Sequence, residues 1–110
     1  MRTNIKGTNI TLTDAIKDYL NKRLSTLEKL LDPKDESVMM HVEVGKTTMH
    51  HLAGDFFRTE LNLHMARKDL RAVSEMADLY SSIDEAKDEM MNELIEILDI
   101  EEEEKKKNEK

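Results

Sequence analysis

Basic side chains on one predicted helix are the first candidates for chemistry in this sequence. Apolar residues recur every three or four positions over residues 13–32, which is typical of an amphipathic helix. If Leu20 marks the centre of the buried stripe, then Lys22 and Lys29 lie close together on the opposite side, and Arg23 lies at the flank of the stripe. A compact basic face can bind phosphate groups, because each neutralised phosphate releases counterions. The alternative is an ordinary solvated face, which Asp18 on the same side supports, and the residues alone favour that interpretation.

The other cationic candidates lie mainly in predicted loops and at strand ends. The connection between Gly45 and Gly54 carries residues that could meet RNA, and the turn and strand after it could extend a positive rim. The alternatives are an exposed loop and a charged hairpin end that discourages edge pairing. This second set of candidates comprises Lys46, His50, His51, Arg67, Lys68, Arg71 and Lys87.

The sequence contains little that indicates metal binding or catalysis. Adjacent residues on a strand point to opposite faces, so the pair His50 and His51 makes a poor metal site, and no carboxylate lies at a familiar ligand spacing. His41 and His64, on separate predicted strands, lack a third ligand. The sequence has no cysteine, no serine in a glycine-rich elbow, no phosphate-binding loop and no zinc-protease motif. We therefore expect no enzyme activity, no cofactor and no metal.

The elements that must position the basic residues alternate along the chain. Runs with a period of two predict strands, and two apolar stripes of helical period predict helices. Each strand has one polar face, which indicates an antiparallel sheet covered by helices on one side only. The resulting α+β fold has the order β-α-β-β-β-α, with two helices on one face of a four-stranded sheet, and is similar to double-stranded-RNA-binding domains. The predicted strands are 2–7, 37–45, 56–65 and 70–75, and the predicted helices are 13–32, ended by Pro33, and about 78–98.

The second predicted helix opens with a distinctive segment, Asp78 to Asp84. Asp78 suits the N-cap position, and the apolar stripe begins directly after it. Tyr80 could stack on a nucleic-acid base, but an aromatic ring at a helix start more often packs between helix and sheet with its hydroxyl in water, which we favour here.

Charge and composition limit the classes of protein to which this chain can belong. The 110-residue chain has a net charge of −7, and residues 78–100 alone carry eight acidic side chains against one basic side chain. That helix is therefore a poor electrostatic partner for nucleic acid. The absence of cysteine and of any apolar run near the ~20 residues of a membrane span suggests a soluble cytoplasmic protein. We expect one domain over residues 1–98 and a charged C-terminal tail over residues 99–110.

An ordered set of short segments resembles one family, the short ribosome-hibernation factors, which include hibernation-promoting factors and ribosome-associated inhibitors. The resemblance covers residues 1 to about 98. Its segments are Ile5-Lys6-Gly7, Leu12-Thr13-Asp14-Ala15-Ile16, Lys22-Arg23-Leu24, Leu27-Glu28-Lys29-Leu30, Val42-Glu43-Val44, Phe57 to Leu63, and Asp78 to Asp84.

The resemblance implies a non-enzymatic translation inhibitor. Members of this family bind the small ribosomal subunit in its decoding channel and block the messenger RNA and transfer RNA sites under stress or in stationary phase. Basic side chains hold ribosomal RNA phosphates, and by position Lys22, Arg23 and Lys29 are the contacts expected from the first helix. The long form of the family adds a C-terminal dimerisation domain, which this chain is expected to be too short to contain.

One departure from the family pattern keeps other functions open. The family often carries a basic series after its Asp-x-Tyr-x-x-Ile-Asp motif, whereas residues 89–96 here contain three glutamates and Lys87 is the only basic residue nearby. The first alternative is a general RNA-binding module. The second is a protein-interaction or self-assembling module that uses the acidic helix and the open sheet face, with weak homo-oligomers as a possible state.

Overall fold

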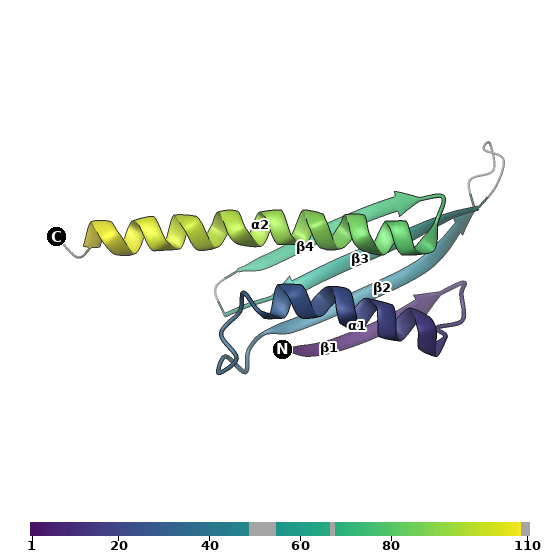
Figure 1. Cartoon of the computed structure of the whole chain (residues 1–110), viewed down its shortest axis with the longest axis horizontal. Coiled ribbons are helices and arrows are strands. Elements are labelled where there is room, and N and C mark those ends of the chain that lie inside the picture. Colours follow the sequence, from purple (N-terminus) through teal and green to yellow (C-terminus); the bar gives the residue numbers. More distant parts are fainter. Residues whose placement is uncertain (49–54, 67, 109–110) are drawn as a thin grey trace.

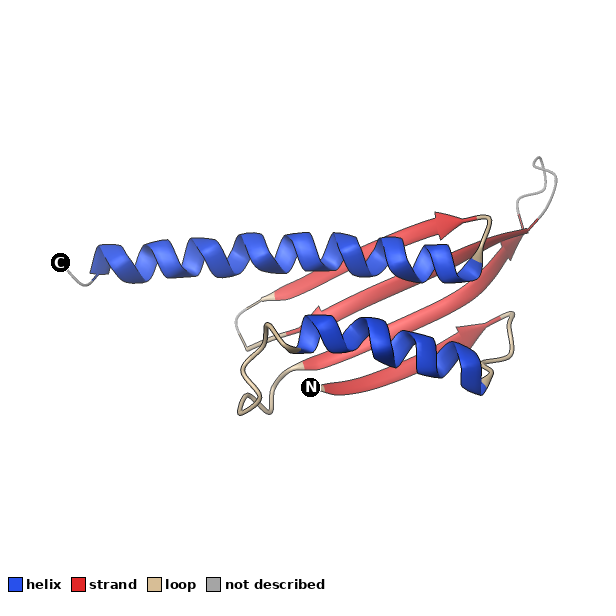
Figure 2. Cartoon of the chain, in the orientation of Figure 1, coloured by secondary structure: helices blue, strands red, loops and turns tan. Residues whose placement is uncertain are grey.

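The computed structural model describes residues 1–48, 55–66 and 68–108, and within them the chain forms four strands and two helices. Both helices lie on the same face of the sheet and leave the other face open (Figures 1 and 2). The predicted order β-α-β-β-β-α is confirmed. The elements are β1 (Arg2–Thr8), α1 (Asp14–Glu28), β2 (Met39–Thr48), β3 (Asp55–His64), β4 (Asp69–Met76) and α2 (Leu79–Asn108).

The sheet is mixed, so the expectation of a purely antiparallel sheet was wrong. The strand order is β1-β2-β3-β4, with β1 parallel to β2 and the other neighbours antiparallel. The cause is the connection through α1. A helix between two adjacent strands returns the chain to the end where the first strand began, and the two strands then run in the same direction. Alternation of apolar residues reports the buried face of a strand and not its direction.

The parallel pair β1–β2 requires a glycine at one point of close approach. A Cβ atom added at Gly45 would lie 2.9 Å from the backbone oxygen of Thr8, its register partner in β1. Real Cβ atoms do not come this close to backbone, so the absence of a side chain at Gly45 lets the edge strand pair fully.

Helix α1 begins where the sequence predicts and ends earlier. The Thr13 hydroxyl accepts a hydrogen bond from the Ile16 backbone N–H at 3.2 Å, as expected of an N-cap. The helix stops at Glu28 rather than continuing to Pro33. The Leu30 N–H donates to the Leu27 carbonyl three residues back, at 3.0 Å, so the chain tightens into a turn before the proline is reached.

The hydrophobic core lies between the helices and the inner face of the sheet. The two predicted helical stripes are both buried there, with Ile16, Leu20, Leu24 and Leu27 from α1 and Ile83, Ala86, Met90 and Leu94 from α2. The sheet contributes alternate residues of β2, β3 and β4, among them Met40, Val42, Val44, Leu61, Leu63, Leu70 and Ala72. Burying these side chains is the main favourable term in folding.

Helix α2 is much longer than the sheet it covers. Its last turns project past the strands, and residues 99–108 belong to this helix (Figure 1). Within the described residues, neither helix combines the length and the apolar composition that crossing a membrane requires.

One pair of hydroxyl groups is buried between α2 and the sheet. Thr59 of β3 and Ser82 of α2 are both 0% exposed, and their oxygens lie 2.8 Å apart. The Ser82 hydroxyl also donates to the Leu79 carbonyl at 2.6 Å. Because the single Ser82 proton is used in that bond, Thr59 must be the donor between the two hydroxyls.

This assignment predicts that substitutions of Ser82 and Thr59 lower the free energy of unfolding by different amounts. Ser82→Ala leaves the buried Thr59 donor without its acceptor and should lower the free energy of unfolding by roughly 1–3 kcal/mol. Thr59→Val removes the donor but leaves the Ser82 proton bonded to Leu79, so it should cost less, about 1 kcal/mol. The measurement is urea denaturation of both single variants and the double variant. Additive losses, or a larger loss for Thr59→Val, would contradict the assignment.

Candidate nucleic-acid interface

The two lysines predicted on the outer side of α1 are where the sequence placed them. Lys22 and Lys29 are exposed, and Lys29 is the C-cap residue of the helix. Seven residues are close to two helical turns, so these ammonium groups share one side of α1 about 10 Å apart along its axis. Two flexible lysine side chains on one side of a helix can each contact a phosphate of the same nucleic-acid strand.

Arg23 is not simply part of that solvated face. Its Nε lies 2.9 Å from Asp84 Oδ1 of α2, and its Nη2 donates to the Tyr19 hydroxyl at 3.0 Å. The Tyr19 hydroxyl in turn donates to the Asp84 carboxylate, at 2.7 Å and 2.8 Å from its two oxygens. Tyr80 completes the group, with its ring edge-on to the Tyr19 ring and 4.7 Å between the ring centroids. We call these four residues, Tyr19, Arg23, Tyr80 and Asp84, the interhelix clasp.

The clasp orients the Arg23 guanidinium. The hydrogen bond to Tyr19 and the charge of Asp84 raise the pKa of Arg23. The guanidinium carbon also lies 5.0 Å from the centroid of the Tyr19 ring, within cation–π range. The Arg23 side chain remains 44% exposed, so a phosphate could still reach it. Asp84 nevertheless offsets part of its positive charge.

The segment Asp78 to Asp84 contributes to the clasp, to the N-cap of α2 and to the core. Asp78 is the N-cap of α2, because its Oδ2 accepts from the Ser81 N–H at 2.9 Å, as predicted. Ile83 is buried in the core. The Tyr80 ring packs against Tyr19 of α1, and the residue is 37% exposed. The sequence could not reveal this partner, since it lies more than sixty residues away in the chain.

Two further cationic candidates are already paired with carboxylates. Arg71 on the open face of the sheet contacts Glu60 with both its Nε and its Nη2, each at 2.5 Å. Lys87 of α2 lies 2.7 Å from Asp88, and its side chain is only 16% exposed. Glu60 and Asp88 partly neutralise the charges of Arg71 and Lys87, which makes these two residues weaker candidates than Lys22 and Lys29.

The other candidates stand apart from α1 or lie outside the described residues. Lys46 is half-buried in β2, and Lys68 is exposed just before β4. His50, His51 and Arg67 lie outside the described residues. Among the candidates in the described part of the chain, those on α1 are the ones that share one surface.

The open face of the sheet carries mainly polar side chains from alternate residues of all four strands. Glu43 and Glu60 lie directly opposite each other on β2 and β3. Burial raises the pKa of Glu60, but the hydrogen bond from Arg71 and the charges of Arg58 and Arg71 outweigh it, and the pKa is lowered overall. Glu43 instead accepts a hydrogen bond from the Thr8 hydroxyl at 3.0 Å.

Histidines on this face do not form a metal site. His64 Nδ1 lies 2.5 Å from Asp69 Oδ1 across the β3–β4 pair. Among the described residues, no three histidine, aspartate or glutamate side chains come close enough together to hold a metal ion.

The clasp geometry predicts coupled effects on stability. Tyr19→Phe removes the hydroxyl that joins Arg23 to Asp84 and should lower the free energy of unfolding by roughly 1 kcal/mol, after allowance for partial exposure. Asp84→Asn should lower it as well, and added salt should reduce the Asp84→Asn effect because the partners are partly exposed. Urea denaturation of the two single variants and the double variant tests this. Because Tyr19→Phe removes the donor of the Tyr19–Asp84 hydrogen bond and Asp84→Asn removes the charge of its acceptor, strictly additive losses would argue against the clasp.

Comparison with known proteins agrees with this fold. The chain is 30% identical over 95 residues to the ribosome hibernation promoting factor of Azotobacter vinelandii, over 86% of this chain and 80% of that protein. It is 29% identical over 94 residues to the factor of the same name from Klebsiella oxytoca, over 86% of this chain and 90% of that protein.

A solved structure gives the same result. The N-terminal domain of Protein Y from Thermus thermophilus superposes with a TM-score of 0.70 at 30% sequence identity, and the match covers 86% of this chain and 96% of that domain. A family model described as Sigma 54 modulation protein / S30EA ribosomal protein matches residues 3–99. The resemblance drawn from the sequence is confirmed, and the chain belongs to the Sigma 54 modulation protein / S30EA ribosomal protein family.

Proposed function

We propose that this protein is a ribosome hibernation factor that binds the small ribosomal subunit in the decoding channel. Bound there, it inhibits translation by blocking the messenger RNA and transfer RNA sites under stress or in stationary phase. The observation that carries the proposal is the basic side of α1, with Lys22 and Lys29 exposed two turns apart, in a chain whose family membership spans almost its whole length. The site of action would be the cytoplasm, where ribosomes work.

The mechanism is steric and electrostatic. The relatives are hibernation factors, a non-enzymatic class, which confirms the prediction that the chain is not an enzyme. Lys22 and Lys29 would neutralise phosphates of ribosomal RNA, and the counterions released would drive association. Arg23 would add a third, weaker contact at the flank of this face, held in place by Tyr19 and Asp84.

The acidic second helix limits how the protein faces RNA. Glu89 and Glu96 of α2 are exposed, and a phosphate strand lying along them would be repelled. We therefore place α1 toward the RNA and the outer face of α2 away from it. A general RNA-binding module is the rival function, and it would bind naked duplex RNA as tightly as ribosomes.

Charge reversal on α1 tests the RNA-binding face. Lys22→Glu with Lys29→Glu should weaken binding to purified small subunits by at least tenfold and reduce its dependence on salt concentration, because two phosphate contacts are lost. The matched control is Lys17→Glu with Lys34→Glu, which changes the net charge equally at exposed positions; Lys17 lies about 140° around the helix from Lys22. Co-sedimentation at two salt concentrations measures both. Equal losses of subunit affinity in the two double variants would show that net charge, and not the position of the lysines, determines binding.

A second pair of variants separates the two possible roles of Arg23. Arg23→Ala removes both the clasp and the charge, whereas Asp84→Asn disrupts the clasp and keeps the charge. If Arg23 contacts RNA, only Arg23→Ala should weaken subunit binding, and Asp84→Asn should leave it equal or stronger because the charge is no longer offset. Similar losses in both variants would show that Arg23 acts only by holding the helices together.

Reversal of the acidic residues tests the orientation of α2. Glu89→Lys with Glu96→Lys adds positive charge to the outer face of α2 without touching the core. If this face points away from RNA, subunit binding at moderate salt should change by less than about threefold, since exposed charges beyond about 8–10 Å are screened. A gain of tenfold or more would place α2 against RNA.

A further inference from the structure

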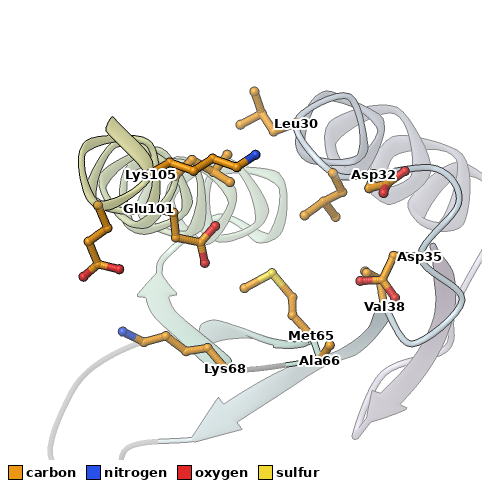
Figure 3. A pocket seen from close by; sticks show the side chains of 12 residues that line it. Leu30, Asp32, Asp35, Val38, Met65, Ala66, Lys68, Glu101 and Lys105 are labelled. Atoms are coloured by element: carbon orange, nitrogen blue, oxygen red, sulfur yellow. The ribbon is translucent and has the colours of Figure 1, made fainter. Parts of the chain in front are cut away.

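A groove at the C-terminal end of the helical layer is not used by the proposed RNA contact. It lies between the end of α1, the following loop, the β3–β4 turn and the projecting part of α2, and has a volume of about 460 Å³ (Figure 3). That is within the range of about 300–1,000 Å³ that is usual for binding pockets. We call it the distal groove.

The floor of the distal groove is apolar. Leu30 and Leu31 enter it from the end of α1, Met65 from the turn after β3, and Leu98 from α2. Figure 3 shows Met65 between the helices and the strands. Leu30 is 36% exposed although it directly follows the C-cap of α1. The early end of α1 and the projection of α2 together leave this surface uncovered.

The rim of the distal groove is mainly acidic. Asp32 and Asp35 stand on the loop side, and Glu101 and Glu104 stand on the α2 side, with two lysines, Lys68 and Lys105, among them. Hydrogen bonds from the Ser37 hydroxyl and backbone N–H lower the pKa of Asp35, so this carboxylate is ionised at neutral pH.

From the apolar floor and the acidic rim, we propose that the distal groove docks a lysine- or arginine-rich peptide segment of another protein that carries one or two apolar side chains. The apolar side chains enter between Leu30, Met65 and Leu98, while the cationic side chains meet the rim carboxylates. This occupant follows from charge complementarity, because the four carboxylates of the lining outnumber its two lysines and disfavour phosphate-bearing ligands. The docking role is independent of the RNA contact on α1 and extends the proposed function to a protein partner.

The chain offers a matched pair of charge reversals for the test. Glu101 and Glu104 line the groove, whereas Glu102 and Glu103, on the same helix and also exposed, do not. Glu101→Lys with Glu104→Lys and Glu102→Lys with Glu103→Lys therefore change the net charge identically. They differ only in whether the change lies at the groove.

The probe is a short synthetic peptide that alternates lysine with leucine, titrated into the full chain at low and moderate salt. We expect saturable binding, with backbone NMR shifts concentrated at Leu30, Met65 and Leu98. Glu101→Lys with Glu104→Lys should weaken affinity by roughly tenfold and the matched variant by less than about twofold. A lysine-only peptide should bind more weakly, because it leaves the floor uncovered.

Two results would overturn the proposal. Equal losses in both charge variants, with shifts spread along α2, would mean general attraction to an acidic helix. Concentration-dependent self-association that is abolished by Glu101→Lys with Glu104→Lys would mean that a second copy of this chain occupies the groove. A circular dichroism spectrum matching the parent protein is required of each variant.

Discussion

The burial of a single face of the sheet beneath two helices is the constraint on which the rest of this structure depends. The inner residues of β2, β3 and β4 and the stripes of both helices form one continuous core, so each helix is fixed against the sheet by its apolar side. That leaves the outer side of α1, the outer side of α2 and the open face of the sheet to solvent. The proposed RNA contact lies on the outer side of α1, whereas the distal groove opens where α1 ends and α2 projects past the sheet.

Polar contacts then fix where α2 begins and how it meets α1. Ser82 bonds Thr59 inside the core, Ser74 of β4 donates to Glu85 at 2.7 Å, and Asp84 holds Tyr19 and Arg23. All of these α2 contacts come from its first two turns. Because hydrogen bonds are directional whereas apolar contacts are not, this group of bonds sets the rotation and register of the helix more narrowly than the core can.

The distribution of charge gives the two helices different uses. Helix α1 exposes Lys22 and Lys29 together with the carboxylates of Asp18 and Glu28, whereas α2 presents mainly carboxylates, so α1 repels phosphate less than α2 does. The arginines of the sheet do not alter this division. Arg58 lies 3.5 Å from Glu60 and 3.7 Å from Glu75, and Arg71 is held by Glu60. The basic face of α1 and the acidic groove at the far end of α2 are therefore compatible with two partners of opposite charge.

The sequence alone determined the elements, the buried face of each and the location of the exposed lysines, because these depend on periodicity and on caps such as Thr13 and Asp78, which are local. The sequence also indicated the protein family, because short segments typical of that family occur in the same order. It did not determine the direction of β1, the early end of α1, the pairing of Arg23 with Asp84 or the distal groove. Each of these depends on residues far apart in the chain that meet only when both helices pack on the same face, and a one-dimensional pattern carries no information about which side chains will meet there.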